Sequence, residues 1–140
     1  AEIKQILGTD RRWPVVIVGI GNWGRALLGY RGFRQQGFEI VAAFDTDPAV
    51  IGTTIDGIQI HHIDDLKTFA EQHEVRLGVL AVPGEAAQEV AAQLEDAGVE
   101  GILNFSPTTL ADKTVAVVAV DLAIELEQLT FNVVNRRKNT

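Results

Sequence analysis

Three closely spaced glycines and one distant aspartate are the residues of this chain with the clearest chemistry. The segment Gly19-Ile20-Gly21-Asn22-Trp23-Gly24 has the spacing G-x-G-x-x-G, and Asp45 follows the last glycine by 45 − 24 = 21 residues. In a βαβ unit this pattern is typical of a loop that binds the pyrophosphate of a dinucleotide, with an acidic residue about 20 positions later on the adenosine ribose. Gly19 would permit the tight turn, Gly21 the approach of the pyrophosphate, and Gly24 the close packing of helix on sheet.

The carboxylate of Asp45 indicates which dinucleotide this loop would bind. It can accept hydrogen bonds from both hydroxyls of the adenosine ribose, and its charge would repel the 2′-phosphate of NADP, which usually needs a nearby arginine. The next two residues are Thr46 and Asp47, and neither is basic. The pattern therefore favours NAD(H). The alternatives are that the glycines form a turn without a ligand, or that Asp45 only caps the turn before Pro48.

Two further loops are candidates for contact with the nicotinamide half of the cofactor. Each follows an apolar segment and contains a proline, which gives a stiff and mostly apolar wall. Ligands of open parallel sheets bind where the strands end, so both loops would border the same site. The expected cofactor-binding residues are therefore Gly19, Gly21, Asn22, Trp23 and Gly24 in the glycine loop, Asp45 and Thr46, then Ala81, Val82 and Pro83, and finally Asn104, Phe105, Ser106 and Pro107.

Candidates for catalysis are few. A dehydrogenase needs a proton donor or acceptor near the nicotinamide. His61 and His62 follow a short predicted strand and His73 is near the end of a polar helix, and these positions are more typical of solvated or supporting side chains. Their spacing does not match a metal site, and the sequence has no cysteine. We therefore predict cofactor binding without turnover, with no catalytic residue and no metal.

Strands and helices must alternate to position these loops. The segment 15–18 is a continuous β-branched run, typical of a strand covered on both faces. Alternation of this kind predicts an α/β fold, a Rossmann-type doubly wound parallel sheet with strand order 3-2-1-4-5-6. We expect six strands, at 15–18, 38–44, 58–60, 77–82, 101–105 and 114–120, and helices at 22–31, 63–73, 85–97 and from an N-cap at Asp121 to 135.

The last predicted helix is apolar on several sides. A terminal helix can bury only one side against its own sheet, so the remaining apolar surface favours a second subunit. We therefore predict a homodimer formed through the C-terminal helix, which packs on the partner or is exchanged with it. The apolar residues are the stripe Leu122, Leu126, Leu129 and Val133, together with Ile124, Phe131 and Val134 on other faces.

Composition narrows the remaining possibilities. The chain has 140 residues, 46% of them hydrophobic, which suits one domain with a buried core. Its net charge of −7 argues against binding nucleic acid by itself. No apolar run is long enough for a membrane span, and we expect a cytoplasmic protein with no membrane contact. The opening segment 1–8 has the pattern of the end of a helix without its beginning, which suggests a fragment.

Several motifs taken together identify a family. They are Gly19 to Leu28, Tyr30 to Phe33, Phe44 to Pro48, Ala81 to Pro83, Gly101 to Pro107, and Val120 to Leu122. In this order, over nearly the whole chain, they resemble the Rex family of redox-sensing transcriptional repressors. Members carry an N-terminal winged-helix DNA-binding domain, so the resemblance implies that residues 1–13 are a remnant helix and linker, 14–120 the NAD(H)-binding domain, and 121–140 a dimerisation helix and tail.

The resemblance also implies a mechanism. NADH and NAD⁺ would compete for one site per subunit, and NADH would close the dimer so that the absent N-terminal domains release operator DNA. The C-terminal helix would be exchanged between subunits, with Asp121 and Tyr30 as the switch and Leu122 near the nicotinamide, where the family often has an aromatic residue. Trp23 stands where a smaller aliphatic residue is usual. The alternative is the nucleotide-binding domain of an enzyme, either an NAD-dependent dehydrogenase or a CoA ligase subunit.

Overall fold

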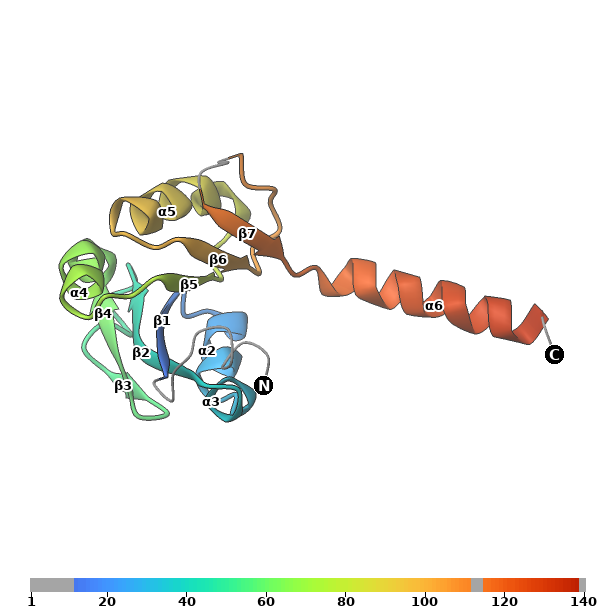
Figure 1. Cartoon of the computed structure of the whole chain (residues 1–140), viewed down its shortest axis with the longest axis horizontal. Coiled ribbons are helices and arrows are strands. Elements are labelled where there is room, and N and C mark those ends of the chain that lie inside the picture. The colour runs from blue at the N-terminus through green and yellow to red at the C-terminus, as the bar shows by residue number, and fades with distance from the viewer. Residues whose placement is uncertain (1–11, 112–114, 139–140) are drawn as a thin grey trace.

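A mostly parallel sheet forms the centre of the domain, with helices on both of its faces (Figure 1). The computed structural model describes residues 12–111 and 115–138, so the predicted remnant helix and linker at 1–13 lie outside the described residues except for positions 12 and 13. The elements are β1 (Trp13–Val18), α2 (Asn22–Leu28), α3 (Gly32–Gln35), β2 (Phe38–Asp45), β3 (Thr54–Ile55), β4 (Ile58–His62), the 3₁₀-helix η1 (Ile63–Asp65), α4 (Leu66–Gln72), β5 (Leu77–Leu80), α5 (Gly84–Asp96), β6 (Gly101–Asn104), β7 (Ala116–Ala119) and α6 (Leu122–Lys138).

The strand order confirms the predicted fold class. The sheet runs β3-β4-β2-β1-β5-β6-β7, and every neighbouring pair is parallel except β3 and β4. Without β3 this is the predicted order 3-2-1-4-5-6. The sequence prediction missed β3, a two-residue strand that turns into β4 through Asp56 and Gly57, both with positive φ (51° and 82°). An Asp-Gly pair is a strong hairpin signature, so a signal for β3 was present.

Burial on both faces explains the β-branched run of β1. Val16 and Val18 point to the face covered by α4 and α5, where they pack with Leu80 and Leu94. Val15 and Ile17 belong to a second cluster on the opposite face, which includes Leu28 of α2. The central strand is thus enclosed by two apolar layers, as a parallel sheet requires.

Two predicted helices are shorter and more broken than expected. The segment 22–31 was predicted as one helix ended by Gly32, but α2 ends at Leu28 and Gly32 instead begins the short helix α3. The predicted helix 63–73 begins as a 3₁₀ turn, at whose start the side chain of His62 accepts a hydrogen bond from the Asp64 N–H. None of the helices in the described part of the chain has the length and apolar composition of a membrane span.

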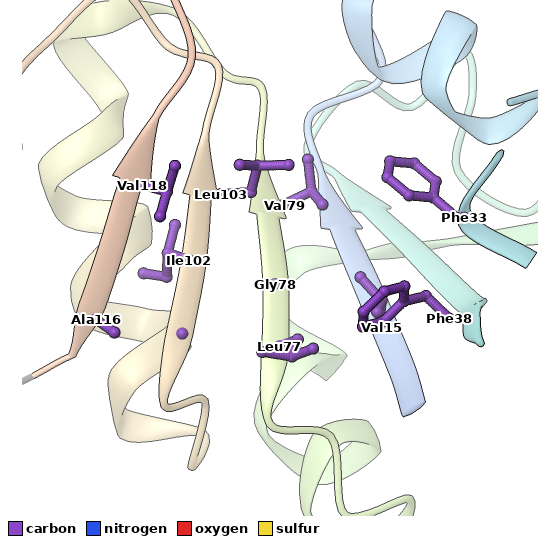
Figure 2. Close-up of a pocket in the computed structure, with 11 residues that line it drawn as sticks. Val15, Phe33, Phe38, Leu77, Gly78, Val79, Ile102, Leu103, Ala116 and Val118 are labelled. Atoms are coloured by element: carbon purple, nitrogen blue, oxygen red, sulfur yellow. The ribbon is translucent and has the colours of Figure 1, made fainter. Parts of the chain in front are cut away.

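The C-terminal helix leaves part of the sheet without cover. Helix α6 extends away from the domain instead of packing on it (Figure 1). On the face that carries α2, the strands β5, β6 and β7 expose an apolar groove of about 350 Å³ (Figure 2). Figure 2 shows the side chains of Phe33, Leu77, Val79 and Leu103 bordering this groove. The fold therefore has an open apolar groove and an unpacked helix.

Candidate functional site

The glycine loop joins β1 to α2, and its backbone lies close to other backbone segments at Gly19 and Gly24. Gly19 has a φ of 104°, and a Cβ built on it would come 2.5 Å from the carbonyl oxygen of Ala81. A Cβ on Gly24 would overlap the carbonyl oxygen of Gly19, whereas one on Gly21 would meet no protein atom within 4 Å. Gly19 and Gly24 are thus needed by the fold itself. Gly21 faces open space, as a loop that approaches a ligand would.

This difference predicts that two alanine substitutions have unequal effects on stability. Gly24→Ala is expected to lower the free energy of unfolding by about 3 kcal/mol, because backbone atoms would have to move to relieve the overlap. Gly21→Ala is the matched control, with an expected change within about 1 kcal/mol. Urea unfolding of the two variants measures both values. Equal stability of Gly24→Ala and the unmodified chain would contradict the tight packing of helix on loop.

Asp45 is joined directly to the glycine loop. Its Oδ2 accepts a hydrogen bond from the Ile20 N–H at 2.7 Å, and its Oδ1 accepts from the N–H groups of Thr46 at 2.6 Å and Asp47 at 3.0 Å. Asp45 therefore does cap the turn after β2, as the alternative interpretation held, but it also reaches the loop. A carboxylate has about four acceptor positions, so one remains for a ligand hydroxyl.

A pocket of about 780 Å³ lies beside the loop, where β5, β6 and β7 end. The hydroxyl of Ser106 donates to the carbonyl oxygen of Val82 at 2.6 Å and ties the two proline-containing loops together. The rings of Trp23 and Phe105 stand 5.9 Å apart, centroid to centroid. Of the predicted site residues, those that line this pocket are Gly21, Asn22, Trp23, Ala81, Val82, Pro83, Phe105, Ser106, Pro107 and Asp121.

Some predicted residues lie elsewhere. Asn104 is 1% exposed; its side chain donates to the Thr108 carbonyl and accepts from the Ser106 N–H, so it shapes the loop and does not line the pocket. Tyr30 borders a different pocket, against β2 and the β3–β4 turn. Leu122 begins α6, and its side chain lies outside the described structure.

The sequence prediction also missed pocket residues. Thr108, Thr109 and Ile124 line the pocket in addition to the predicted set. The two threonines follow Pro107 directly, so extending the predicted loop would have found them. Ile124 comes from α6, whose first turn borders the pocket. Asp121 accepts hydrogen bonds from the N–H groups of Ala123 and Ile124, which confirms its predicted role as the N-cap of α6.

The histidines have structural partners. The ring of His61 stacks on Phe44, and the ring of His73 stacks on Phe69 with a centroid distance of 4.0 Å. His62 caps η1 through its Nδ1. Within residues 12–111 and 115–138, no three His, Asp or Glu side chains gather as metal ligands would.

Comparison with known proteins gives consistent results. The model of the family described as CoA binding domain matches residues 10–108. The redox-sensing transcriptional repressor Rex of Desulfitobacterium hafniense is 46% identical over 136 residues, which are 96% of this chain and 65% of that protein. The chain thus spans just under two thirds of the length of this relative.

Solved structures show the same similarity. RSP is a repressor of the Rex family. Its crystal structure in complex with beta-NADH has a TM-score of 0.86 to this chain at 28% sequence identity, and the match covers 97% of this chain and 66% of that one. The structure of RSP with beta-NAD⁺ and operator DNA has a TM-score of 0.84 at the same identity, over 97% of this chain and 63% of that one.

Proposed function

The chain belongs to the family of CoA-binding domains and, within it, to the Rex-type repressor domains, and from this premise we propose that it is the NAD(H)-binding sensor domain of a redox-responsive transcriptional repressor. One observation carries the proposal: Asp45 at the end of β2 is hydrogen-bonded to the glycine loop at Ile20. The pyrophosphate site and the ribose acceptor are therefore parts of one rigid arrangement.

The same carboxylate favours NAD(H) over related cofactors. A dinucleotide that crosses β1 would have its adenosine over β2, with a ribose hydroxyl donating to Asp45. CoA carries a phosphate on the 3′ oxygen of that ribose, and NADP carries one on the 2′ oxygen. Either phosphate would be repelled by the negative charges of Asp45 and the nearby Asp47. The sequence between β2 and Pro48 contains no basic residue that could offset this repulsion.

The pocket at the ends of β5 to β7 would hold the nicotinamide half. Its walls come from the loops at Ala81 to Pro83 and at Phe105 to Pro107. Among its described lining residues, Asp121 has the one ionisable side chain, and it is engaged as a helix cap. A group placed to exchange protons with a substrate is thus missing from this lining, which supports sensing over the alternative of a dehydrogenase.

Helix α6 supports a homodimer. Six of its large apolar side chains are at least 43% exposed, among them Leu126 at 64% and Phe131 at 61%. The groove on the sheet face of the same chain is the complementary apolar surface. We propose that α6 of one subunit packs on, or is exchanged with, the partner, and that operator DNA is contacted through an N-terminal domain outside this chain. A repressor of this kind would act in the cytoplasm.

The junction between the pocket and α6 could couple cofactor binding to the geometry of the dimer. Asp121 lines the pocket and caps α6, so a cofactor that moves Asp121 also moves the helix. We assign Asp121 and Tyr30 as the switch. They border different pockets of one chain, so we propose that they meet across the dimer.

Small-angle X-ray scattering tests this sensing function. We expect the dimer saturated with NADH to be more compact than the dimer saturated with NAD⁺. Asp121→Asn should reduce the difference, since asparagine keeps the helix cap but removes the charge. Identical scattering of the two wild-type complexes at saturation would refute a redox-dependent change of dimer geometry.

A further inference from the structure

Trp23 is a large apolar side chain in an unusual place. It belongs to the first turn of α2, directly before Gly24, and yet it is 47% exposed. Its indole borders the pocket at the ends of β5 to β7, with the ring of Phe105 inclined to it by 31°. The two rings come from different elements, one from the first turn of α2 and one from the loop after β6. Phe105 also packs against the core cluster that contains Ile17 and Val79, whereas Trp23 is not part of either core cluster in the described residues.

The position of Trp23 decides which part of the cofactor it would meet, if the proposed function holds. The glycine loop lies at the end of β1, the central strand of the order β4-β2-β1-β5-β6. Asp45 lies on the β2 side of that loop, and the pocket with Trp23 lies on the β5 and β6 side. A dinucleotide that gives its adenosine ribose to Asp45 therefore extends its nicotinamide toward Trp23 and Phe105.

The nicotinamide ring changes its charge with its oxidation state. In NAD⁺ the ring is a planar aromatic cation, and in NADH it is a neutral dihydropyridine. Indole is the most favourable aromatic partner for a cation, because its face is rich in electron density. We propose that Trp23 is a specificity-determining residue that stacks on the nicotinamide and raises the affinity for NAD⁺ relative to NADH.

Two other residues of the pocket, Phe105 and Asp121, would also influence the binding of the nicotinamide. The ring of Phe105 lies beside the indole of Trp23 with an interplanar angle of 31°, so the two rings form one aromatic surface at the pocket. The carboxylate of Asp121 lines the same pocket and would also attract a cation. Asp121 is exposed, so salt screens its contribution, whereas a stacked indole keeps its contribution at high salt.

Calorimetric titration of NAD⁺ and NADH into Trp23 variants tests the proposal. In Trp23→Leu we expect the NAD⁺ dissociation constant to rise about 3- to 10-fold more than that of NADH, at 0.15 M and at 0.5 M salt alike. For Trp23→Phe, the ratio of the NAD⁺ and NADH dissociation constants should lie between that of the wild type and that of Trp23→Leu. Trp13→Phe is the control, because Trp13 begins β1 at the end opposite to the glycine loop, and its ratio of affinities should not change. Thermal unfolding verifies that each variant is folded.

Fluorescence gives an independent readout. The sequence has two tryptophans, so Trp13→Phe leaves Trp23 as the sole tryptophan, and its emission can be followed by selective excitation. Both cofactors should quench it. An unchanged affinity ratio in Trp23→Leu, with both cofactors bound by the wild type, would overturn the role of Trp23 and leave the proposed function standing. Absence of binding of either cofactor to the wild type would overturn both.

Discussion

Replacing Asp45 by alanine is expected to weaken NADH binding by about 100-fold. The change removes the proposed acceptor of the ribose hydroxyl and the observed acceptor of the Ile20 N–H, so the loop loses the contact that ties it to β2. A hydrogen bond to a charged group contributes about 1.5 to 3 kcal/mol, which makes a loss of two orders of magnitude reasonable for this pair. The dimer should remain intact, because Asp45 lies at the end of β2 and not on α6, the proposed dimer helix. Fluorescence titration with NADH measures the effect.

Asp47→Ala is the matched control for this experiment. Asp47 is also acidic and also caps a turn, since its Oδ1 accepts from the Ala49 N–H at 2.9 Å, but within the described residues its side chain makes no hydrogen bond to the glycine loop. We expect its affinity for NADH to stay within about 3-fold of the wild type, as for a substitution away from the ligand. An affinity of Asp45→Ala equal to that of Asp47→Ala would remove Asp45 from the site.

The double substitution Leu126→Glu and Leu129→Glu is expected to convert a dimer into a monomer. Both side chains are more than half exposed on an isolated chain, so the change should leave the fold of one subunit undisturbed. In a dimer each would be buried, and burial of a leucine contributes about 1.5 to 3 kcal/mol. Replacement by charged residues in both subunits should raise the dimer dissociation constant by more than about 1,000-fold. Sedimentation velocity at micromolar concentration shows the change directly.

Asn132→Glu provides the control on the same helix. Asn132 is exposed and accepts a hydrogen bond from Gln128 within α6, so a glutamate there should leave the dimer intact. If the wild-type chain sediments as a monomer, or if the double variant remains a dimer, the exposed apolar stripe of α6 has another purpose.

The elements with strong periodicity were predictable, and those that depend on tertiary contact were not. The buried run of β1, the glycine spacing and the Asp121 cap are local features, and the structure has each of them. The break between α2 and α3 was not foreseen. Around it, the Tyr30 ring occupies the space that a Cβ on Gly32 would need, and it packs edge-on against Phe33. This contact is specific to the folded chain.

Asn104 shows why the site was only partly predictable. It was predicted to contact the cofactor as part of a proline-containing loop, yet both of its hydrogen-bonding groups are used inside that loop. Likewise, the bond from Ser106 to Val82 joins loops that are 24 residues apart in the sequence. Sequence patterns locate the loops at the ends of the strands. Which side chain faces the pocket and which supports it depends on packing that the pattern does not contain.

We propose that the glycine loop and Asp45 bind NAD(H), although the family whose model matches this chain is described as a CoA binding domain. Isothermal titration calorimetry of this chain with NADH, followed by CoA in a separate titration, tests the claim most directly. We expect saturable binding of one NADH per subunit and no binding of CoA at the same ligand concentration. Tighter binding of CoA than of NADH would contradict it.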